Sequence, residues 1–350
     1  MINIFFVLII LVIISILIYF FLKKKILLIV QLFAKILHLG EHFFLFKLFN
    51  KNLIISSKKF TNKKNNFKIA IIIQGPIIDK SNFTIETINF YLHNYPFAPI
   101  IVSTWEGDAK KIKKIFKKEI NKKIYLILNK IPKYSGYKNI NLQAVSTKNA
   151  INFAKKLRCK YVLKTRSDIR IYSKNFNEYL FNLIKFYKLK YKIKKQKERI
   201  ISTSFTLRYR LYAVSDLVMF GNANDLYNYF DVLTDIKIDE KFYKFIKNLR
   251  FKDKNYFVQK EFCPEVYFFS EFFKKIDKKL SWTPKDYINK LSENFIIIDN
   301  NSLSIYWKKS NKLDNHFSDQ ATPKENSLEF CFSDWFNFFI KGIKINRFNK

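Results

Sequence analysis

The chain has 350 residues, of which 49% are hydrophobic and 18% aromatic, so it is long and apolar enough for a large folded domain, and a disordered or low-complexity protein is excluded. Its 64 basic and 28 acidic residues give a formal net charge of +36, which favours a polyanionic partner, although lysine, isoleucine, asparagine and phenylalanine are abundant throughout, as in proteins from AT-rich genomes. Three dispersed cysteines without a CxxC pair exclude a disulfide framework and a zinc ribbon.

The chain begins with an apolar segment. Residues 2–22 form an uncharged run of 21 residues that ends at Lys23, Lys24 and Lys25, and an α-helix needs about 20 residues to cross a bilayer. The run has no charged segment before it and no small-residue cleavage site after it, unlike a secretory signal peptide. Residues 1–25 are therefore predicted to be a transmembrane anchor, with the basic cluster and the rest of the chain on the cytoplasmic side.

Residues 26–66 are predicted to be an amphipathic juxtamembrane segment followed by a linker. Between residues 26 and 49, Leu27, Val30, Ala34 and Leu37 share one helical face, which suits a helix that lies along the membrane surface. A second membrane span over the same residues is the alternative, and it would reverse the topology. Residues 50–66 are polar and basic, as in a linker.

From residue 67 short β-branched runs alternate with amphipathic periods. Strands are predicted at 69–73, 100–105, 124–128 and 161–164, and helices at 84–94, 112–120 and 142–157. This alternation predicts an α/β fold, a mostly parallel sheet with helices on both faces. Ligands of such sheets bind beyond the carboxyl ends of the strands.

That rule selects three loops as a candidate ligand site. They contain Gln74, Gly75 and Pro76; the segment 103–106 with Thr104; and Arg166, Ser167 and Asp168, with Arg170 two residues later. Arginine binds phosphate oxygens in a fork, and a carboxylate can hold a divalent cation, so the third loop suits a diphosphate. The alternative is a structural turn in which Asp168 caps the backbone and pairs with Arg166.

Residues 184–199 carry eight basic residues and one glutamate, interleaved with aromatic residues. Three interpretations are open: a surface that stacks nucleic-acid bases, a surface that binds an anionic membrane, and a solvated helix face. The predicted anchor favours the membrane over nucleic acid. Further on, 295–299 and 303–307 are predicted to form a β-hairpin around Asn300 and Asn301, and 311–350 a C-terminal tail.

Six segments carry a resemblance to a known family. In chain order they are IIIQGPI at 71–77, STW at 103–105, ST at 146–147, LKTRSDIRI at 163–171, YAVSDLVMFG at 212–221 and PEVYF at 264–268. Together they resemble the WavE family of lipopolysaccharide core synthesis, over roughly residues 67–275. The resemblance implies a GT-A-type glycosyltransferase, with a Rossmann-like catalytic domain over 67–310 that takes a nucleotide-sugar donor.

In GT-A enzymes an Asp-any-Asp loop after the fourth strand holds Mn²⁺ or Mg²⁺ on the donor diphosphate. Here that loop keeps only the final carboxylate, Asp168, so the resemblance implies either a divalent cation on Asp168 or neutralisation of the diphosphate by Arg166 and Lys164 without a metal. An inverting transfer also needs a general base. Glu265, predicted at a helix N-terminus after Pro264, is the first candidate, and Asp216 is its rival as base or as acceptor ligand.

The resemblance thus implies an enzyme of the bacterial inner membrane with a cytoplasmic catalytic domain. It would transfer a sugar to a lipid-linked glycan, either lipopolysaccharide, lipooligosaccharide or a capsular glycan. Two alternatives stay open: a nucleotidyl- or phosphosugar transferase of surface-polysaccharide synthesis, and a non-enzymatic membrane protein that binds polyanions through its lysines.

Overall fold

The computed structural model describes residues 69–78, 82–111, 123–191, 195–206, 210–232, 234, 263–276, 279–308 and 330–341, and before them Ile14 and Tyr19. The chain divides into two compact units, 1–65 and 66–350, and every element below belongs to the second. Among the described residues no helix has the length and hydropathy to cross a membrane. The predicted anchor and the predicted surface helix over 26–49 lie outside the described residues, apart from Ile14 and Tyr19.

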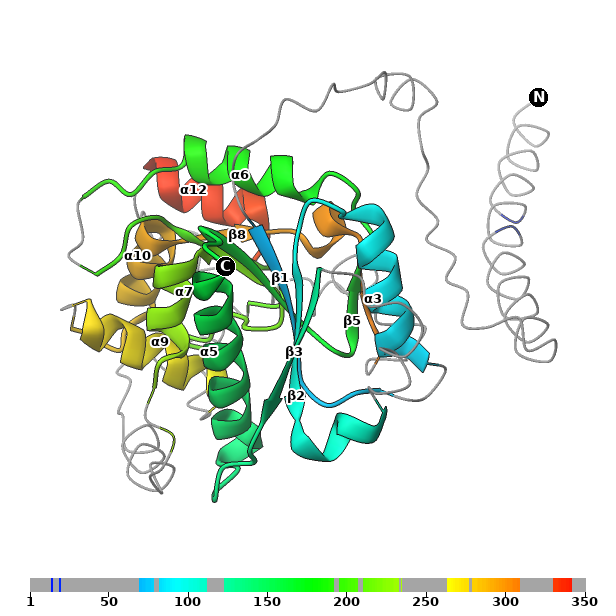
Figure 1. Cartoon of the computed structure of the whole chain (residues 1–350). Coiled ribbons are helices and arrows are strands. Elements are labelled where there is room, and N and C mark those ends of the chain that lie inside the picture. The colour runs from blue at the N-terminus through cyan, green and yellow to red at the C-terminus, as the bar shows by residue number, and fades with distance from the viewer. Residues whose placement is uncertain are drawn as a thin grey trace, which may run out of the picture. The chain divides into compact units, whose positions relative to one another are not determined.

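A seven-stranded sheet in the order β3-β2-β1-β4-β7-β6-β8 forms the centre of this unit (Figure 1). Only β7 runs antiparallel to its neighbours, so the predicted mostly parallel α/β fold is confirmed. The four strands predicted from apolar runs are all present. The strands span Ile69–Gln74 (β1), Ile100–Trp105 (β2), Ile124–Asn129 (β3), Tyr161–Arg166 (β4), Ile200–Thr203 (β6), Met219–Asn222 (β7) and Phe295–Ile298 (β8).

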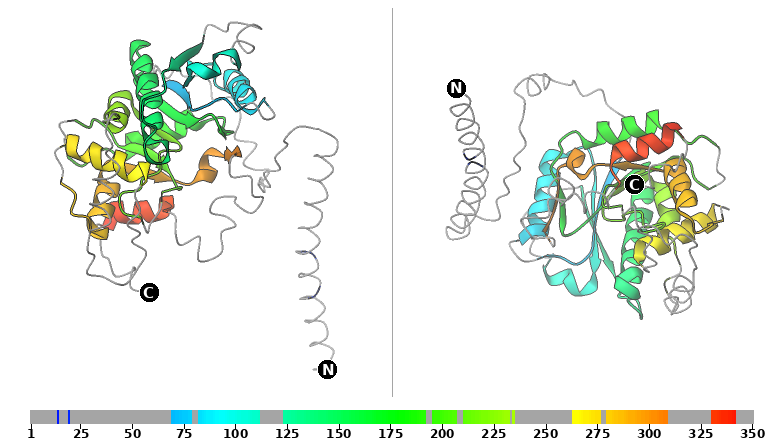
Figure 2. Two further views of the ribbon diagram at one scale, coloured as in Figure 1. Left: turned by 90° about the horizontal axis from the view of Figure 1, so that it is seen from below. Right: turned by 180° about the vertical axis from the view of Figure 1, so that it is seen from behind.

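Helices cover both faces of this sheet, as predicted (Figures 1 and 2). The ring of Tyr161 in β4 meets Phe181 of α6 (Phe176–Phe186), whereas Lys164 lies over the ring of Phe230 in α7 (Ala223–Phe230). Because residues at odd spacing along a strand point to opposite faces, α6 and α7 lie on opposite sides of β4. The predicted helices at 84–94 and 142–157 correspond to α3 (Phe83–Asn94) and α5 (Ile140–Lys156), while that at 112–120 lies outside the described residues.

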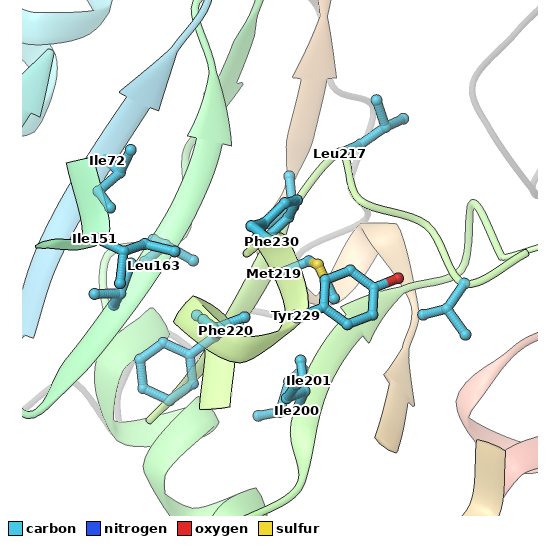
Figure 3. Packing of buried hydrophobic residues seen from close by; sticks show 14 of the residues in the cluster. Ile72, Ile151, Leu163, Ile200, Ile201, Leu217, Met219, Phe220, Tyr229 and Phe230 are labelled. Carbon is cyan, nitrogen blue, oxygen red and sulfur yellow. The ribbon is translucent and has the colours of Figure 1, made fainter. Parts of the chain in front are cut away.

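The core lies between the sheet and these helices. All six residues of β1 are buried, and its five apolar side chains join one continuous apolar cluster that includes Leu163, Phe220 and Phe230 (Figure 3). Burial on both faces explains why β1 and β2 appear in the sequence as unbroken apolar runs rather than as alternating ones.

The predicted hairpin over 295–307 is wrong. β8 pairs in parallel with β6, whereas β9 (Ile305–Trp307) pairs antiparallel with β5 (Ile169–Ile171) in a separate two-stranded sheet. Between them Asn300–Leu303 form a short 3₁₀ helix, and Ser304 then adopts a left-handed conformation. The turn therefore sends the chain from one sheet to the other instead of folding it back on itself.

Three later helices, α9 (Pro264–Lys275), α10 (Pro284–Asn294) and α12 (Phe332–Lys341), complete the unit. In α12 Trp335 is fully buried, and its Nε1 donates to the carbonyl of Phe295 at 2.8 Å. This part of the predicted tail therefore packs on β8. The basic segment 184–199 is not one helix face, because α6 ends at Phe186 and the described residues beyond it are not helical.

Candidate active site

The three predicted loops lie side by side at the carboxyl edge of the sheet. The amide of Gly75 donates to the carbonyl of Ser103 at 3.0 Å, and the amide of Ser167 donates to the carbonyl of Gln74 at 2.9 Å. The ends of β1, β2 and β4 are therefore joined by backbone hydrogen bonds into one surface, which is the place where ligands of such sheets bind.

Gly75 is required by this contact. Its φ of +119° is one that residues with a side chain rarely adopt, and an added Cβ would lie 2.9 Å from Oγ of Ser167. Glycine thus lets the first loop approach the third. Pro76 follows it and is exposed.

Gln74 belongs to a buried polar network beneath the loops. Its Nε2 donates to Oγ of Ser146 at 2.9 Å, and Oγ of Ser103 donates to the carbonyl of Ser146 at 2.7 Å. Asn129 completes the network, because its Nδ2 donates to Oγ of Ser103 at 2.9 Å. The network fixes the ends of β1, β2 and β3 against α5, and it uses the side chain of Gln74 internally.

Thr104 also has an internal partner. Its Oγ1 donates to Oδ2 of Asp108 at 2.7 Å, and the same oxygen accepts the amide of Ile77 at 3.1 Å. Asp108, buried and one turn after β2, thus joins the first and second loops. Asp108 lies outside the three loops that the sequence predicted.

Arg166 and Asp168 form a two-bond ion pair in the third loop. Nε and one terminal nitrogen of Arg166 each lie 2.9 Å from a different carboxylate oxygen, and Nε1 of Trp307 donates to Oδ2 of Asp168 at 3.0 Å. Burial alone would raise the pKa of Asp168, but the hydrogen bonds and charge of Arg166 outweigh it, and this pKa lies below its ordinary value. For the same reason the pKa of Arg166 is raised although burial opposes it.

The residues of this loop do not fit a resident divalent cation. The one carboxylate accepts three hydrogen bonds, its charge is paired with Arg166, and the next charge along β4 is Lys164. In the part of the chain that the structure describes, no group of three or more His, Cys, Asp or Glu side chains could hold a metal ion. The contacts correspond to the structural turn considered from the sequence, with Asp168 paired to Arg166.

Lys164 and Asp216 form a second ion pair, in the interior. Nζ of Lys164 lies 3.6 Å from Oδ2 of Asp216 and also donates to the backbone carbonyl of Asp216, and the two side chains are 0% and 3% exposed. Burial lowers the pKa of Lys164, and the charge of Asp216 opposes this shift. Burying two charges is costly, and such pairs are frequent at functional sites.

Glu265, from α9, joins this pair. Pro264 is the first residue of α9, as predicted, and the partly buried Glu265 follows it. Burial and the neighbouring charge of Asp216 raise the pKa of Glu265 above its ordinary value. The hydroxyl of Tyr229, buried within electrostatic reach of both carboxylates, has no hydrogen-bond partner among the described residues.

The structure therefore brings Glu265 and Asp216, residues 49 positions apart in the chain, into one cluster. Arg166 lies within electrostatic reach of both. We name Lys164, Arg166, Asp168, Asp216 and Glu265 the edge cluster. It places two cations beside three carboxylates in different environments, an arrangement suited to binding a phosphate and moving a proton.

Arg170 has a different place. Its Nε donates to Oγ1 of Thr87 at 2.9 Å, and a terminal nitrogen donates to the carbonyl of Phe83 at 3.2 Å and pairs with Glu86 at 3.3 Å. Its guanidinium thus holds α3 against β5. The sequence offered no signal for this role, nor for the contact of Trp307 with Asp168, which spans 139 positions.

Comparisons with solved structures give matches of low similarity. A 4-diphosphocytidyl-2C-methyl-D-erythritol synthase from Anaerococcus prevotii is 12% identical, with a TM-score of 0.35, and the match covers 67% of this chain and 88% of that one. The glycosyltransferase GlyE of Streptococcus pneumoniae is 11% identical, with a TM-score of 0.31, over 78% of this chain and 60% of that one. A comparison with curated protein sequences gives no match.

The comparison with family models is the decisive one. The model described as WavE lipopolysaccharide synthesis matches residues 69–341. This range runs from the first strand of the sheet to the end of α12 and contains every residue of the edge cluster. The chain therefore belongs to the WavE lipopolysaccharide synthesis family.

Proposed function

We propose that this protein transfers a sugar from a nucleotide-sugar donor to a glycan acceptor in lipopolysaccharide or lipooligosaccharide synthesis. The observation that carries the proposal is the edge cluster. A carboxylate with a raised pKa, Glu265, lies within electrostatic reach of Arg166 at the carboxyl ends of the parallel strands. Membership of a lipopolysaccharide synthesis family supports the same class of reaction.

Arg166 is suited to the leaving group. Two of its five N–H groups donate to Asp168, and 24% of its side chain is exposed, so further donors remain for a phosphate. Asp168 and Trp307 fix its orientation before substrate binds. Such preorganised donors stabilise the charge that develops on the departing nucleotide phosphate.

Glu265 is suited to accept the acceptor's proton. In a direct displacement the acceptor hydroxyl gives its proton to Glu265 as its oxygen bonds to the anomeric carbon. The bond from that carbon to the phosphate oxygen breaks, and its electron pair stays on the nucleotide. Asp216, 2% exposed, acts as a positioning residue, because its charge raises the pKa of Glu265. No step requires a cation on Asp168.

The test uses the full chain with a panel of nucleotide sugars and a truncated lipopolysaccharide acceptor, with and without EDTA. We expect one donor to release its nucleotide and the glycan to gain one sugar, with little effect of EDTA. Glu265→Gln should lower kcat by about 10²–10⁴-fold. Arg166→Ala should lower kcat/KM and be partly rescued by free guanidinium.

The matched control is Glu271→Gln, because Glu271 lies in the same helix and pairs with Lys274 at 2.5 Å, away from the cluster. It should retain activity. Pyrophosphate release from a nucleoside triphosphate and a sugar phosphate, without glycan extension, would instead identify a nucleotidyltransferase. Failure of every donor with a well-folded chain would reject the enzymatic proposal and leave polyanion binding.

A further inference from the structure

A second surface, at the opposite edge of the sheet, shows features that the reaction does not use. Phe186, Tyr191 and Ile340 are large apolar side chains that are 80%, 71% and 58% exposed, and a group of such side chains on one face can mark an interaction surface. Two come from the end of α6 and the loop after it, and one comes from α12. We name residues 185–191 and 332–340 together the amino-edge surface.

Direct contacts make these segments one surface. Tyr187 packs edge-on against four rings of α12, with centroids 5.0–6.2 Å away from those of Phe332, Trp335, Phe336 and Phe339. Nζ of Lys190 lies 5.3 Å from the ring centroid of Phe339. The helices α6 and α12 accordingly run side by side in the views of Figures 1 and 2. The exposed apolar side chains of both segments thus belong to one contact face.

The charge of this surface is positive. Lys185, Lys188 and Lys190 are exposed there, and Lys195 follows. Its one acidic residue, Asp334, is occupied locally, since its carboxylate accepts the amide of Cys331 at 3.0 Å. Exposed aromatic and aliphatic side chains among lysines match a bilayer interface that carries anionic headgroups.

The strand directions place this surface where the chain enters the domain. The carbonyl of Lys188 accepts from Arg199, directly before β6, and Trp335 bonds to Phe295, the first residue of β8. Because β6 and β8 run in the same direction as β1, their amino ends share an edge with Ile69. The 68 residues before Ile69, with their uncharged run at 2–22, therefore join the domain at this edge.

The basic character continues along the same edge. A cavity of about 500 Å³ beside the amino end of β4 is lined by four basic residues, Lys155, Arg158, Lys160 and Lys197, and by one acidic residue, Glu198, among others. The edge cluster, in contrast, lies at the carboxyl ends of the strands. Positive charge and exposed apolar side chains thus coincide at the edge that does not carry the proposed reaction.

We propose that the amino-edge surface docks on an anionic lipid bilayer. The proposal is independent of the reaction, because it uses none of the edge-cluster residues. Lysines are attracted to anionic headgroups, and exposed apolar side chains that insert at the interface add to this attraction, so the two features together favour one orientation of the domain on the bilayer. Docked in this way, the domain directs its carboxyl edge away from the bilayer surface.

The test is amide hydrogen exchange on the full chain in nanodiscs of phosphatidylcholine, alone or with about one-third phosphatidylglycerol. Only discs that co-purify with the protein are measured, so residues 1–68 are present equally in both. We expect exchange of residues 186–191 and 332–340 to slow at least about fivefold in the anionic discs. About 0.5 M salt should reverse this protection.

The chain offers a matched control at the other edge. Ile131, Tyr134 and Tyr137 are 67%, 40% and 43% exposed and also alternate with lysines. The triple change Phe186→Ser, Tyr191→Ser and Ile340→Ser should abolish the protection of residues 186–191 and 332–340. Changing the three control residues to serine should leave that protection in place. Both variants should have the wild-type Tm.

Several outcomes would overturn the proposal. They are equal protection in both lipids, protection of residues 130–139 instead, failure of anionic discs to retain the protein, and concentration-dependent protection without lipid, which would indicate self-association.

Discussion

The charge of Asp216 acts on the carboxylate of Glu265, and this interaction predicts a pH dependence. Burial and the charge of Asp216 raise the pKa of Glu265. A general base acts only when deprotonated, so kcat/KM should fall as the pH drops through this raised value rather than near the ordinary glutamate value of about 4.3. Asp216→Asn removes the like charge and should move the acid limb of the profile to lower pH. The measurement is kcat/KM against pH for both proteins.

The pH dependence of stability and the partner of Asp216, Lys164, both require a control. Burial raises the pKa of Asp225 to about 7 in the folded protein. The free energy of unfolding therefore falls as the pH rises from the pKa of Asp225 in the unfolded chain to its pKa in the folded protein. For this reason the folded fraction must be measured at each pH. Asp216→Asn also leaves Lys164 without its partner. If that variant does not fold, the double change Lys164→Met and Asp216→Asn removes both charges. An unmoved acid limb in a folded variant would separate Asp216 from the base.

Asp168→Asn distinguishes a structural carboxylate from a metal ligand. Asparagine keeps one acceptor oxygen and replaces the other by an NH₂ donor, so it cannot accept all three hydrogen bonds that Arg166 and Trp307 donate to Asp168, and it lacks the charge that pairs with Arg166. We expect the free energy of unfolding to fall by about 1–3 kcal/mol and donor KM to rise, with any response to EDTA unchanged. Thermal or urea unfolding and donor titrations measure these effects.

The control is Asp231→Asn, because Asp231 pairs with Lys148 and Lys275 at 3.2 Å while 38% of its side chain is exposed. Its loss should cost about 1 kcal/mol or less. If Asp168 held a metal ion instead, the Asp168→Asn variant would keep the wild-type stability. Its transfer rate would fall by orders of magnitude, and it would no longer show the divalent-ion dependence of the wild-type protein.

At the scale of elements, the sequence predicted best what depends on local pattern. The runs at 69–73, 100–105 and 161–164 became β1, β2 and β4 because each is buried on both faces, which leaves an unbroken apolar signal. The three loops followed from strand direction alone, since carboxyl ends of parallel strands share an edge.

The wrong prediction concerned which strands pair with each other, not where the strands lie in the sequence. The strands at 295–299 and 303–307 were predicted close to their observed positions, but period and turn residues do not say which strand pairs with which. Their true partners, β6 and β5, are 95 and 136 residues away by the paired positions Ile200–Phe295 and Arg170–Tyr306. Packing between distant segments therefore determines these pairings, not the local Asn-Asn turn signal. The contact between Trp307 and Asp168 also joins distant positions, so local sequence patterns could not predict it.

On the scale of the whole molecule, strand direction separates two surfaces. The edge cluster lies at the carboxyl ends of β1 and β4, and the amino-edge surface lies at the amino ends of β6 and β8. An acceptor embedded in a membrane would then have to extend around the domain to reach Glu265. We therefore expect that short, water-soluble glycan acceptors are used without any requirement for docking.

The basic residues near the amino terminus predict how the chain is oriented relative to the membrane. Lys23, Lys24 and Lys25 follow the uncharged run 2–22, and basic residues next to a span stay in the cytoplasm. A reporter joined after Phe60 should therefore behave as cytoplasmic, on the side where nucleotide sugars are made. Changing the three lysines to glutamine should give mixed orientations, because the basic bias is weakened. A periplasmic reporter in the unchanged chain would mean that residues 26–49 form a second span, and it would separate the edge cluster from its proposed donor.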